Sequence, residues 1–395
     1  MKILTFTNLY PNAAQPHLGI FVENRLRHLV ADGRVSARVL APVPWFPWRG
    51  ARFGHYGTLA AVPRHEARHG IEIDHPRYPV IPKVGMSMAP LLMYAWCRPA
   101  VARLLESGAD FDLIDAHYFY PDGVAAALLG RHFNKPVTIT ARGSDLNTIP
   151  DHALPRRMIG WAARRAEAVI TVSAALGKTF QELGYQCRRQ RTLRNGVDLQ
   201  AFRPVERSAL LRKLDLQSPV LASVGNLLPA KGHDLAIHAL TELPAATLLI
   251  AGTGPDEDRL RKLAESLGLT GRVRFLGGVA HETLHEVYSA ADVLILASAR
   301  EGWPNVLLEA MACGTPVAAT DVSGIPEIVT CPAAGRLIPS RDPAAVTATL
   351  RTILADPPDR AETRAYAERF SWDETTEGQI ALFDEILAAA RKSGG

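Results

Sequence analysis

The sequence lacks the features that would place the chain across a membrane or hold it together by disulfides. No apolar run approaches the ~20 residues that a transmembrane helix needs. The first residues, Met1-Lys-Ile-Leu-Thr-Phe, are typical of a strand, so no signal peptide is expected. The four cysteines stand apart without a CxxC pair, and neither a zinc site nor a disulfide framework is indicated. These absences predict a protein of the reducing cytoplasm.

Two common nucleotide-binding motifs are also missing. Lys231 precedes a glycine, but no Gly-Lys-Ser/Thr closes a GxxxxG frame, so the segment is not a P-loop. The Gly252-Thr-Gly segment lacks the third glycine and the distal acid of a dinucleotide-binding fingerprint, and a tight turn explains it better. No nucleic-acid-binding motif accompanies the positive charge, so nucleic acid is not an expected partner.

Acidic residues are scarce in the first half of the chain. Residues 1–200 hold 25 Lys and Arg against 15 Asp and Glu, whereas residues 201–395 hold 19 against 25. The positive charge includes an aromatic and arginine-rich segment at 45–56 and a basic helix expected over 155–166. Such a surface suits an anionic partner, including the inner face of the cytoplasmic membrane. A solvated basic face is an equal alternative.

Strands and helices alternate along the chain, and the alternation occurs twice. Continuous apolar runs such as 112–116 and 220–224 are typical of strands buried on both faces. Helical stretches such as 122–133 and 303–312 lie between such runs. This order predicts an α/β protein with parallel sheets covered by helices.

The polar stretch that separates the two series suggests the domain organisation. We expect a first domain over residues 1–203 and a second over 204–371, with a last helix near 372–395. Residues 42–64 are rich in proline, glycine and aromatic residues, and we expect a long surface loop there.

The most informative segment is Glu301-Gly-Trp-Pro-Asn-Val-Leu-Leu-Glu309. It follows a predicted strand, and Pro304 suits the first position of a helix because its missing N–H would be unpaired there. Open α/β sheets bind ligands at the carboxyl ends of their strands, and the N–H groups of a helix start favour phosphate. Glu309 lies ~7.5 Å along the axis from Pro304 at 1.5 Å per residue. The two acids would therefore address different parts of an extended ligand.

Other predicted strand ends carry residues that could join such a site. Lys231 lies near a helix start, where a cation can neutralise a diphosphate, although a solvated lysine is the simpler interpretation. Gly19 allows close approach of a ligand. His117 ends a buried strand, but a lone histidine is more often structural. Arg142 and Asp145 follow another strand, where the simpler interpretation is a local salt link with a capping aspartate.

The order and separation of four motifs resemble those of glycosyltransferase family 4, over essentially the whole chain. The resemblance implies the GT-B fold, in which two facing Rossmann-like domains place the active site in an interdomain cleft and the last helix crosses back to the first domain. It also implies retaining transfer of sugar from a nucleotide sugar, with no required metal and no cofactor. The motifs are Glu301-x7-Glu309, Lys231-Gly232, Arg194-Asn-Gly-Val-Asp-Leu-Gln-Ala-Phe-Arg-Pro and Gly314-Thr-Pro-Val-Ala-Ala-Thr-Asp-Val-Ser-Gly-Ile-Pro-Glu-Ile.

The resemblance implies a role for each matching position. Glu301 would lie beside the donor sugar, Glu309 would bind the ribose hydroxyls and Lys231 would hold the diphosphate. His117 would contact the transferred sugar, and Gly19 would let the donor phosphate approach the first domain. Glu301, His117 and Lys231 are thus the candidate catalytic residues. Further candidate donor-binding residues are Asn226, Gly302, Pro304, Asn305 and Val306.

Two positions depart from the family pattern. Members often carry an arginine, a second cation for the diphosphate, where this chain has Asn226, so phosphate binding would depend more on Lys231 and on the helix start at Pro304. Members also often carry a histidine before the Gly-x-Asp element, where Arg142 stands. We therefore assign Arg142 and Asp145 to the acceptor side, where Arg142 would meet an anionic donor or acceptor.

The leading hypothesis is a retaining glycosyltransferase that uses a UDP- or GDP-sugar and a glycan or lipid-linked acceptor, in exopolysaccharide, capsule or cell-envelope assembly. No second carboxylate at glycosidase spacing is evident, which favours front-face displacement with the leaving phosphate as proton acceptor. Two alternatives stay open. A nucleotide-sugar epimerase of the same fold would convert the donor without an acceptor, and a non-catalytic nucleotide- or glycan-binding protein would not convert it at all.

Overall fold

The computed structural model describes residues 1–80 and 85–393, which divide into two compact units. Unit 1 comprises Met1–Asn195 together with the C-terminal segment from Asp373, and unit 2 comprises Gly196–Trp372. The last helix, α15 (Asp373–Ser393), thus belongs to unit 1. Residues 394 and 395 of the expected helix lie outside the described residues.

The division lies before the expected boundary at 203/204, and hydrogen bonds explain the difference. The Arg364 guanidinium, on helix α14 (Arg360–Ala367), donates to the carbonyls of Leu199 and Phe202. The Val197 N–H donates to the Phe370 carbonyl. These bonds attach the stretch after Asn195 to unit 2, although it has no regular secondary structure of its own.

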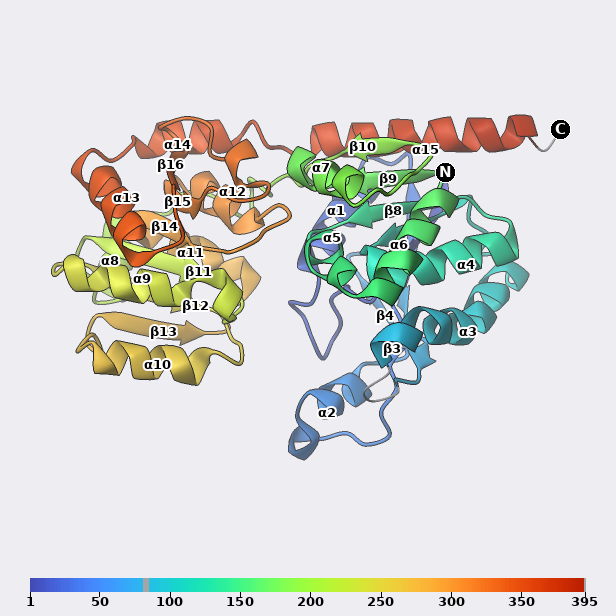
Figure 1. Ribbon diagram of the computed structural model, residues 1–395, viewed down its shortest axis with the longest axis horizontal. Coiled ribbons are helices and arrows are strands. Elements are labelled where there is room, and N and C mark those ends of the chain that lie inside the picture. Colours follow the sequence, from blue (N-terminus) through green and yellow to red (C-terminus); the bar gives the residue numbers. More distant parts are fainter. Residues whose placement is uncertain (81–84, 394–395) are drawn as a thin grey trace. The chain divides into compact units, whose positions relative to one another are not determined.

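Unit 1 contains an eight-stranded sheet in the order β10-β9-β8-β7-β1-β2-β5-β4. Figure 1 labels β10, β9, β8 and β4 of this sheet. All neighbouring strands are parallel except β4 and β5. The strands that follow β1 extend the sheet on one side, and those that follow β7 extend it on the other. The carboxyl ends of β1 and β7 therefore form the switch point where open α/β sheets bind ligands. The strands are β1 (Lys2–Phe6), β2 (Ser36–Leu40), β4 (His65–Arg68), β5 (Ile71–Asp74), β7 (Leu113–His117), β8 (Val137–Ala141), β9 (Ala168–Thr171) and β10 (Gln190–Thr192).

Helices cover this sheet in two packed groups. Helices α1 and α15 share a hydrophobic cluster in which Ile380 and Phe383 of α15 are buried, so the C-terminal helix is part of the core of unit 1. Helices α3, α4 and α6 pack against one another. Helix α3 buries residues three or four positions apart, among them Met93 and Cys97, which is the spacing of one helical face. The helices are α1 (Ile20–Ala31), α2 (Gly54–Ala61), α3 (Gly85–Glu106), α4 (Val124–Phe133), α5 (Ser144–Asn147), α6 (Ala153–Arg165) and α7 (Ala174–Glu182).

The expectation of a long loop over residues 42–64 is wrong in part. The segment contains the short strand β3 (Val43–Pro44), a 3-10 turn (Ala51–Phe53) and helix α2. Val43, Leu59 and Val62 form a small hydrophobic cluster, and β3 pairs with β6 (Arg77–Tyr78). Enough apolar surface is buried in the segment to order a helix, although its aromatic tip remains exposed.

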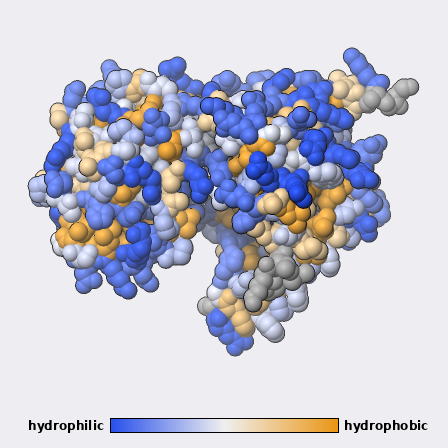
Figure 2. Space-filling view, in the orientation of Figure 1, coloured by the Kyte–Doolittle hydropathy of each residue, from blue (hydrophilic) through white to orange (hydrophobic). Residues whose placement is uncertain are grey.

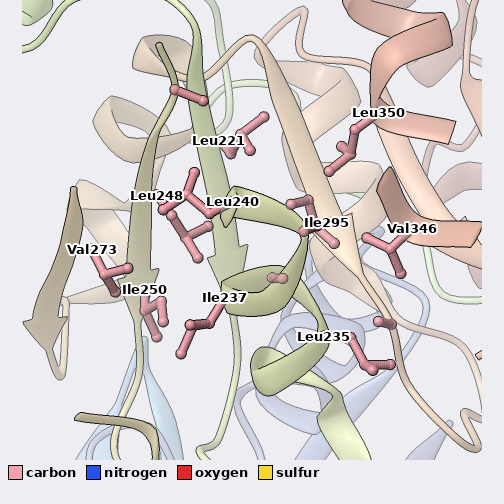
Figure 3. Packing of buried hydrophobic residues seen from close by; sticks show 14 of the residues in the cluster. Leu221, Leu235, Ile237, Leu240, Leu248, Ile250, Val273, Ile295, Val346 and Leu350 are labelled. Carbon is pink, nitrogen blue, oxygen red and sulfur yellow. The ribbon is translucent and has the colours of Figure 1, made fainter. Parts of the chain in front are cut away.

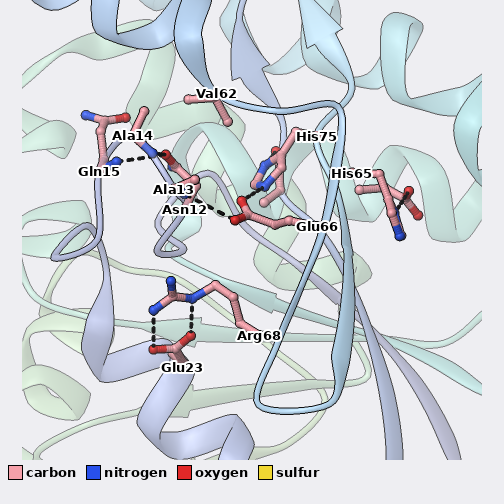
Figure 4. A network of polar contacts seen from close by, with 12 residues as sticks. Asn12, Ala13, Ala14, Gln15, Glu23, Val62, His65, Glu66, Arg68 and His75 are labelled. Carbon is pink, nitrogen blue, oxygen red and sulfur yellow. Dashed lines mark hydrogen bonds and ion pairs between the residues drawn. The ribbon is translucent and has the colours of Figure 1, made fainter.

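Side-chain contacts brace the long connection between β1 and α1. The Glu23 carboxylate of α1 accepts both hydrogen bonds of a forked pair from Arg68 of β4, and Glu66 accepts from the Ala13 N–H (Figure 4). The connection ends at Gly19, whose φ is +65°. A Cβ there would lie 2.1 Å from the Leu9 carbonyl oxygen. The fold itself therefore requires glycine at position 19.

Unit 2 contains a six-stranded, wholly parallel sheet in the order β13-β12-β11-β14-β15-β16. Its switch point lies between β11 and β14. The two predicted parallel sheets and the α/β class are thus confirmed. The elements are β11 (Val220–Val224), β12 (Thr247–Ala251), β13 (Val273–Gly277), β14 (Val293–Leu296), β15 (Val317–Thr320), β16 (Gly335–Ile338), α8 (Arg207–Lys213), α9 (His233–Ala239), α10 (Glu257–Ser266), α11 (Leu284–Ala290), α12 (Asn305–Ala312), α13 (Pro343–Ala355) and α14.

An aliphatic cluster lies in the core of unit 2. Leu221 and Leu248 from the sheet pack with Ile237 and Leu240 from and just after α9, and with Leu350 of α13 (Figure 3). Burial of such side chains stabilises a fold by roughly 1.5–3 kcal/mol each. This packing fixes the strands whose carboxyl ends carry the loops of the candidate site in unit 2. Among the described residues, no helix combines the length and the apolar character that crossing a membrane demands.

Candidate functional site

The switch point of unit 2 brings together two residues that lie seventy positions apart in the chain. Lys231 ends a 3-10 turn after β11, and Glu301 lies in the loop after β14. The Lys231 Nζ donates to Glu301 Oε1 at 2.6 Å, and the Ser298 Oγ donates to the same oxygen at 2.6 Å. The Lys231 side chain is 28% exposed and that of Glu301 is 10% exposed. A partly buried, accessible ion pair therefore occupies the ligand-binding edge of the sheet.

A close backbone contact holds the two loops together. Gly232 follows Lys231 with a φ of +72°, and a Cβ there would lie 2.1 Å from the Ala297 carbonyl oxygen. The Ala299 N–H donates to the Ala230 carbonyl at 2.8 Å. These contacts fix the spacing of the two loops, and with it the distance between the ammonium group and the carboxylate.

Helix α12 begins at Asn305, one residue later than expected. Pro304 is the N-cap residue, with extended dihedral angles, and its carbonyl accepts from the Leu307 N–H. Proline has no N–H, so Pro304 cannot donate to a phosphate. The main-chain N–H groups of Asn305 and Val306 lie in the first turn, where helices favour anions. Gly302 is buried in the preceding loop.

Glu309 lies on α12 and is 8% exposed. Its Oε2 accepts from the Tyr288 hydroxyl at 2.8 Å, and its Oε1 lies 3.3 Å from His281 Nε2. Burial and the nearby Glu309 charge raise the pKa of Tyr288 far above its usual value. Burial disfavours the charged form of His281, but the hydrogen bond to Glu309 and the charges of Glu309, Glu282 and Asp198 together outweigh it and raise the pKa of His281. The Glu309 carboxylate is therefore held in one orientation by two residues that no sequence motif revealed.

Asn226 is exposed in the loop after β11, and its main chain shapes the loop. Its carbonyl accepts from the Leu228 N–H and lies 3.3 Å from His233 Nε2. The His233 Nδ1 lies 2.8 Å from the buried Ser223 hydroxyl. The loop that carries Lys231 is thus anchored to its own sheet.

In unit 1 the structure brings His117 and Arg142 together but gives His117 a different environment from the one expected. His117 is 1% exposed, its Nδ1 lies 2.6 Å from an Arg142 guanidinium nitrogen and its Nε2 lies 3.2 Å from Asp115 Oδ2. Because arginine can only donate, Nδ1 must accept and Nε2 carries the proton. Burial, together with the Arg142 charge and against the pull of Asp115, lowers the pKa of His117 to about 4. Both ring nitrogens bond to the protein, so neither is presented to a sugar here.

A long-range chain of hydrogen bonds positions this histidine. Asp115 also accepts from the Thr138 hydroxyl and from the Gln379 amide of α15. The Gln379 carbonyl oxygen in turn accepts from the Arg25 guanidinium at 2.8 Å. Sequence reasoning missed Asp115 and Gln379, because only the folded chain places α15 against β7.

Asp145 is a capping residue, as the simpler interpretation predicted, but the Arg142 guanidinium bonds to Asn195 and His117 instead of forming the expected salt link with it. It is fully buried, and its carboxylate accepts from the main-chain N–H groups of Phe119, Arg142 and Gly143. Burial raises the pKa of Asp145, although these hydrogen bonds oppose the rise. The residue shapes the turns after β7 and β8, and its carboxylate is not exposed to an acceptor.

No group of three or more His, Cys, Asp or Glu side chains that could hold a metal ion occurs within residues 1–80 and 85–393. The site in unit 2 instead offers one ammonium group, two carboxylates and a helix start. These groups suit an organic phosphate with attached sugars.

Comparison with known protein families gives two matches. Residues 32–201 match the family described as "Glycosyltransferase Family 4", and residues 210–370 match "Glycosyl transferases group 1". The first match lies almost wholly in unit 1 and the second lies within unit 2. Together they cover most of the chain.

Curated relatives carry related names. A protein of Geodermatophilus obscurus called D-inositol 3-phosphate glycosyltransferase is 32% identical over 316 residues, which is 72% of this chain and 69% of the relative. A Mycobacterium leprae protein of the same name is 38% identical over 207 residues, but that match covers 49% of this chain and 48% of the relative. These names favour the transferase over the epimerase and the binding protein.

Solved structures of similar fold cover nearly the whole chain. Sucrose-phosphate synthase from Thermosynechococcus elongatus matches with a TM-score of 0.81 and 21% identity, covering 98% of this chain and 99% of that one. The Anabaena protein HepE in complex with UDP matches with a TM-score of 0.74 and 24% identity, covering 98% and 100%. At these identities the likeness shows the fold.

Proposed function

The chain belongs to glycosyltransferase family 4 and is a retaining enzyme that takes sugar from a nucleotide sugar, and on this premise we propose that Lys231, Glu301 and the start of α12 form its donor site. The observation that carries the proposal is the 2.6 Å ion pair between Lys231 and Glu301 at the switch point of unit 2.

Each group has a distinct part in the proposed chemistry. Cleavage of the bond between sugar and diphosphate builds negative charge on the leaving phosphate and positive charge on the sugar. The Lys231 ammonium and the N–H groups of Asn305 and Val306 would stabilise the phosphate, and fixed donors of this kind act most strongly where water is excluded. Glu301 would face the positive charge on the sugar. An ammonium group has three N–H donors, so Lys231 can hold Glu301 and a phosphate oxygen together.

Glu309 is proposed to bind the ribose hydroxyls of the donor. Its carboxylate oxygens can accept further hydrogen bonds beside those from Tyr288 and His281. For unit 1 we propose that Gly19 admits the donor phosphate. Because both ring nitrogens of His117 bond to the protein, we propose that His117 acts on the transferred sugar indirectly, by holding Arg142 in place.

The acceptor and pathway are proposed in broader terms. We infer a glycan or lipid-linked acceptor in exopolysaccharide, capsule or cell-envelope assembly. The names of the curated relatives add a phosphorylated inositol as an acceptor to test. We also propose front-face displacement, in which the leaving phosphate takes the proton of the acceptor hydroxyl. Trapping a covalent glycosyl group on Glu301 would contradict that mechanism.

A thermal-shift screen tests the donor proposal. The protein is heated with UDP-, GDP-, ADP- and dTDP-sugars, and we expect a UDP- or GDP-sugar to raise the unfolding midpoint most. Ligand at a hundredfold excess over its dissociation constant stabilises the folded state by ~2.7 kcal/mol. The best donor should then release its nucleotide when acceptor is added and should not be epimerised when incubated alone. If none of the nucleotide sugars shifts the midpoint, the proposal is wrong.

We further propose that unit 1 docks on the anionic inner face of the cytoplasmic membrane. Trp45 and Trp48 in the aromatic segment are 55% and 58% exposed, and Trp96 on α3 is 49% exposed. Figure 2 shows hydrophobic and hydrophilic surface side by side over the segment that holds α2. Residues 42–64 and 85–105 contain no acid. Exposed tryptophans with cations and without acids suit the interface of an anionic bilayer.

The neighbouring helices extend this surface. Arg98 and Arg103 are exposed on α3, which packs against α6. Helix α6 is the expected basic helix, and its exposed cations contribute ~1 kcal/mol each near an anionic bilayer. They are Arg156, Arg157, Arg164 and Arg165.

Sedimentation with lipid vesicles tests the membrane proposal. The protein should pellet with phosphatidylglycerol vesicles at low salt, and high salt should release it because salt screens the charges. The double variant Trp48→Ser, Trp96→Ser should bind about tenfold less. Leu228→Ser removes an exposed hydrophobic residue from unit 2 and should change nothing. Wild-type protein that stays in the supernatant would contradict the proposal.

A further inference from the structure

Unit 1 holds a partly buried cation, Arg142, at the carboxyl edge of its sheet, and no ion pair joins its side chain to a carboxylate within residues 1–80 and 85–393. The Arg142 guanidinium donates to Asn195 Oδ1 at 3.1 Å and to His117 Nδ1 at 2.6 Å, and both of these acceptors are neutral. Its Nε is buried and has no hydrogen-bond partner among residues 1–80 and 85–393. Of the nearby acids, Asp145 accepts from the main-chain N–H of Arg142, and Asp115 is bonded to other side chains.

The surroundings hold this guanidinium rigidly. It lies over the Phe21 ring, with its central carbon 5.2 Å from the ring centroid. His117, which accepts one of its hydrogen bonds, is fixed by Asp115, and Asp115 is fixed by Gln379. The position of the cation therefore depends on well-packed side chains, which is how a protein prepares a binding group in advance.

Burial of this charge is costly for the folded protein. Burial, helped by the charge of the neighbouring Arg25 and opposed by the charges of Asp115 and Asp145, lowers the pKa of Arg142 to about 9. A buried cation is normally paired with an acid, because its lost hydration is otherwise uncompensated. In the part of the chain that the structure describes, Arg142 forms no such ion pair, and its side chain donates to neutral groups instead.

The location is where a substrate is expected. Arg142 directly follows β8, His117 ends β7, and Phe21 lies in the first turn of α1 just after Gly19. Strands β1, β7 and β8 are neighbours in the sheet, and β1 and β7 flank its switch point. The cation thus lies among the loops that the fold offers to a ligand.

We propose that Arg142 determines substrate specificity by binding a carboxylate or phosphate group carried by one of the two substrates, either the donor sugar or the acceptor. This inference rests on the proposed function and names a substrate class for it. The planar fork of a guanidinium matches two oxygens of a carboxylate or a phosphate. A substrate with hydroxyl groups alone would give the guanidinium no anion to bond directly, since its present side-chain partners, Asn195 and His117, are neutral.

The alternative is that Arg142 only orients His117. That role would affect charged and neutral substrates equally, whereas binding of an anion would affect only the charged member of a matched pair. The comparison of such pairs therefore separates the two roles.

The experiment measures dissociation constants by calorimetry and kcat/KM for two matched pairs. One pair is UDP-glucuronic acid and UDP-glucose as donors, and the other is inositol 3-phosphate and inositol as acceptors. The wild-type protein should prefer the anionic member of at least one pair by tenfold or more. In the Arg142→Gln variant, affinity and kcat/KM for that anionic member should fall by about 10- to 100-fold. The same quantities for its neutral partner should change by no more than about twofold.

Two further variants serve as controls. Arg142→Lys keeps the charge but lacks the planar fork of the guanidinium. Its affinity and kcat/KM for the anionic member should lie between those of the wild type and Arg142→Gln, and it also serves as the test if Arg142→Gln does not fold. Arg131→Gln removes an exposed cation at the end of α4 and should behave as the wild type. The pair that responds tells whether the anion belongs to the donor or to the acceptor.

Two results would overturn the inference. One is a wild-type protein with no preference for the anionic member of either pair. The other is an Arg142→Gln variant in which affinity and kcat/KM fall equally for both members. Failure of the proposed function would look different, because no nucleotide sugar would then bind even to the wild-type protein. UDP alone, which needs no contact with Arg142 in the proposed site, distinguishes the two failures.

Discussion

Glu301→Gln should lower kcat by about 100- to 1000-fold while changing the KM for the donor by no more than a few-fold. Glutamine keeps the size of the side chain and a hydrogen-bond acceptor for Ser298, but it removes the negative charge. That charge would act on the sugar as positive charge develops in the transition state. An interaction of this kind appears in kcat rather than in KM. Steady-state kinetics with the donor found in the thermal-shift screen measures both values.

A matched control comes from the same unit. Glu265→Gln removes an exposed carboxylate on α10 and should retain full activity. Thermal unfolding of each variant, followed by circular dichroism, shows that it is folded. A Glu301→Gln enzyme as fast as the wild type would rule out Glu301 as a catalytic residue.

Lys231→Met should weaken binding of the nucleoside diphosphate and lower kcat/KM by about 100-fold or more. Methionine preserves much of the apolar stem but removes the cation that would neutralise the diphosphate. The loss should be large because Asn226, in the same loop, supplies no second positive charge. Charge-assisted hydrogen bonds to phosphate are about twice as strong as neutral ones. Calorimetry with UDP and GDP measures the dissociation constant of the nucleotide separately from catalysis.

Lys262→Met, on the exposed face of α10, removes a lysine from the same unit and should bind the nucleotide like the wild type. The double variant at Lys231 and Glu301 adds a further test. The two side chains are in direct contact at 2.6 Å. The loss of transition-state stabilisation in the double variant, calculated from kcat/KM, should therefore be smaller than the sum of the losses in the two single variants. Unchanged nucleotide affinity in Lys231→Met would show that the lysine only supports Glu301.

Several features of the donor site could be predicted because they depend on local sequence. The strand predicted before Glu301 is observed as β14, and the proline after Glu301 indicated a helix start close to its observed position at Asn305. Parallel strands place all their carboxyl ends at one edge. The loops with Lys231 and Glu301 could therefore be assigned to the same edge without coordinates.

Other features could not be predicted because they arise between distant parts of the chain. Tyr288 and His281 hold Glu309, and nothing in their local sequence marks them as partners of an acid on α12. Likewise, Gln379 reaches Asp115 across 264 residues. The roles of His117 and Asp145 were uncertain for the same reason, since burial decides whether a polar group meets a ligand or only the protein.

The sequence by itself determined the α/β class, the two series of strands and helices and the residues at the strand ends, because hydrophobic periodicity and turn residues act over short distances. The tertiary structure alone decided which of those residues pair. In it, Lys231 pairs with Glu301, and both ring nitrogens of His117 bond to protein side chains. The Arg142 guanidinium donates to the neutral groups of Asn195 and His117. These outcomes depend on strand order and side-chain packing, which bring together groups from separate loops and withdraw them from water.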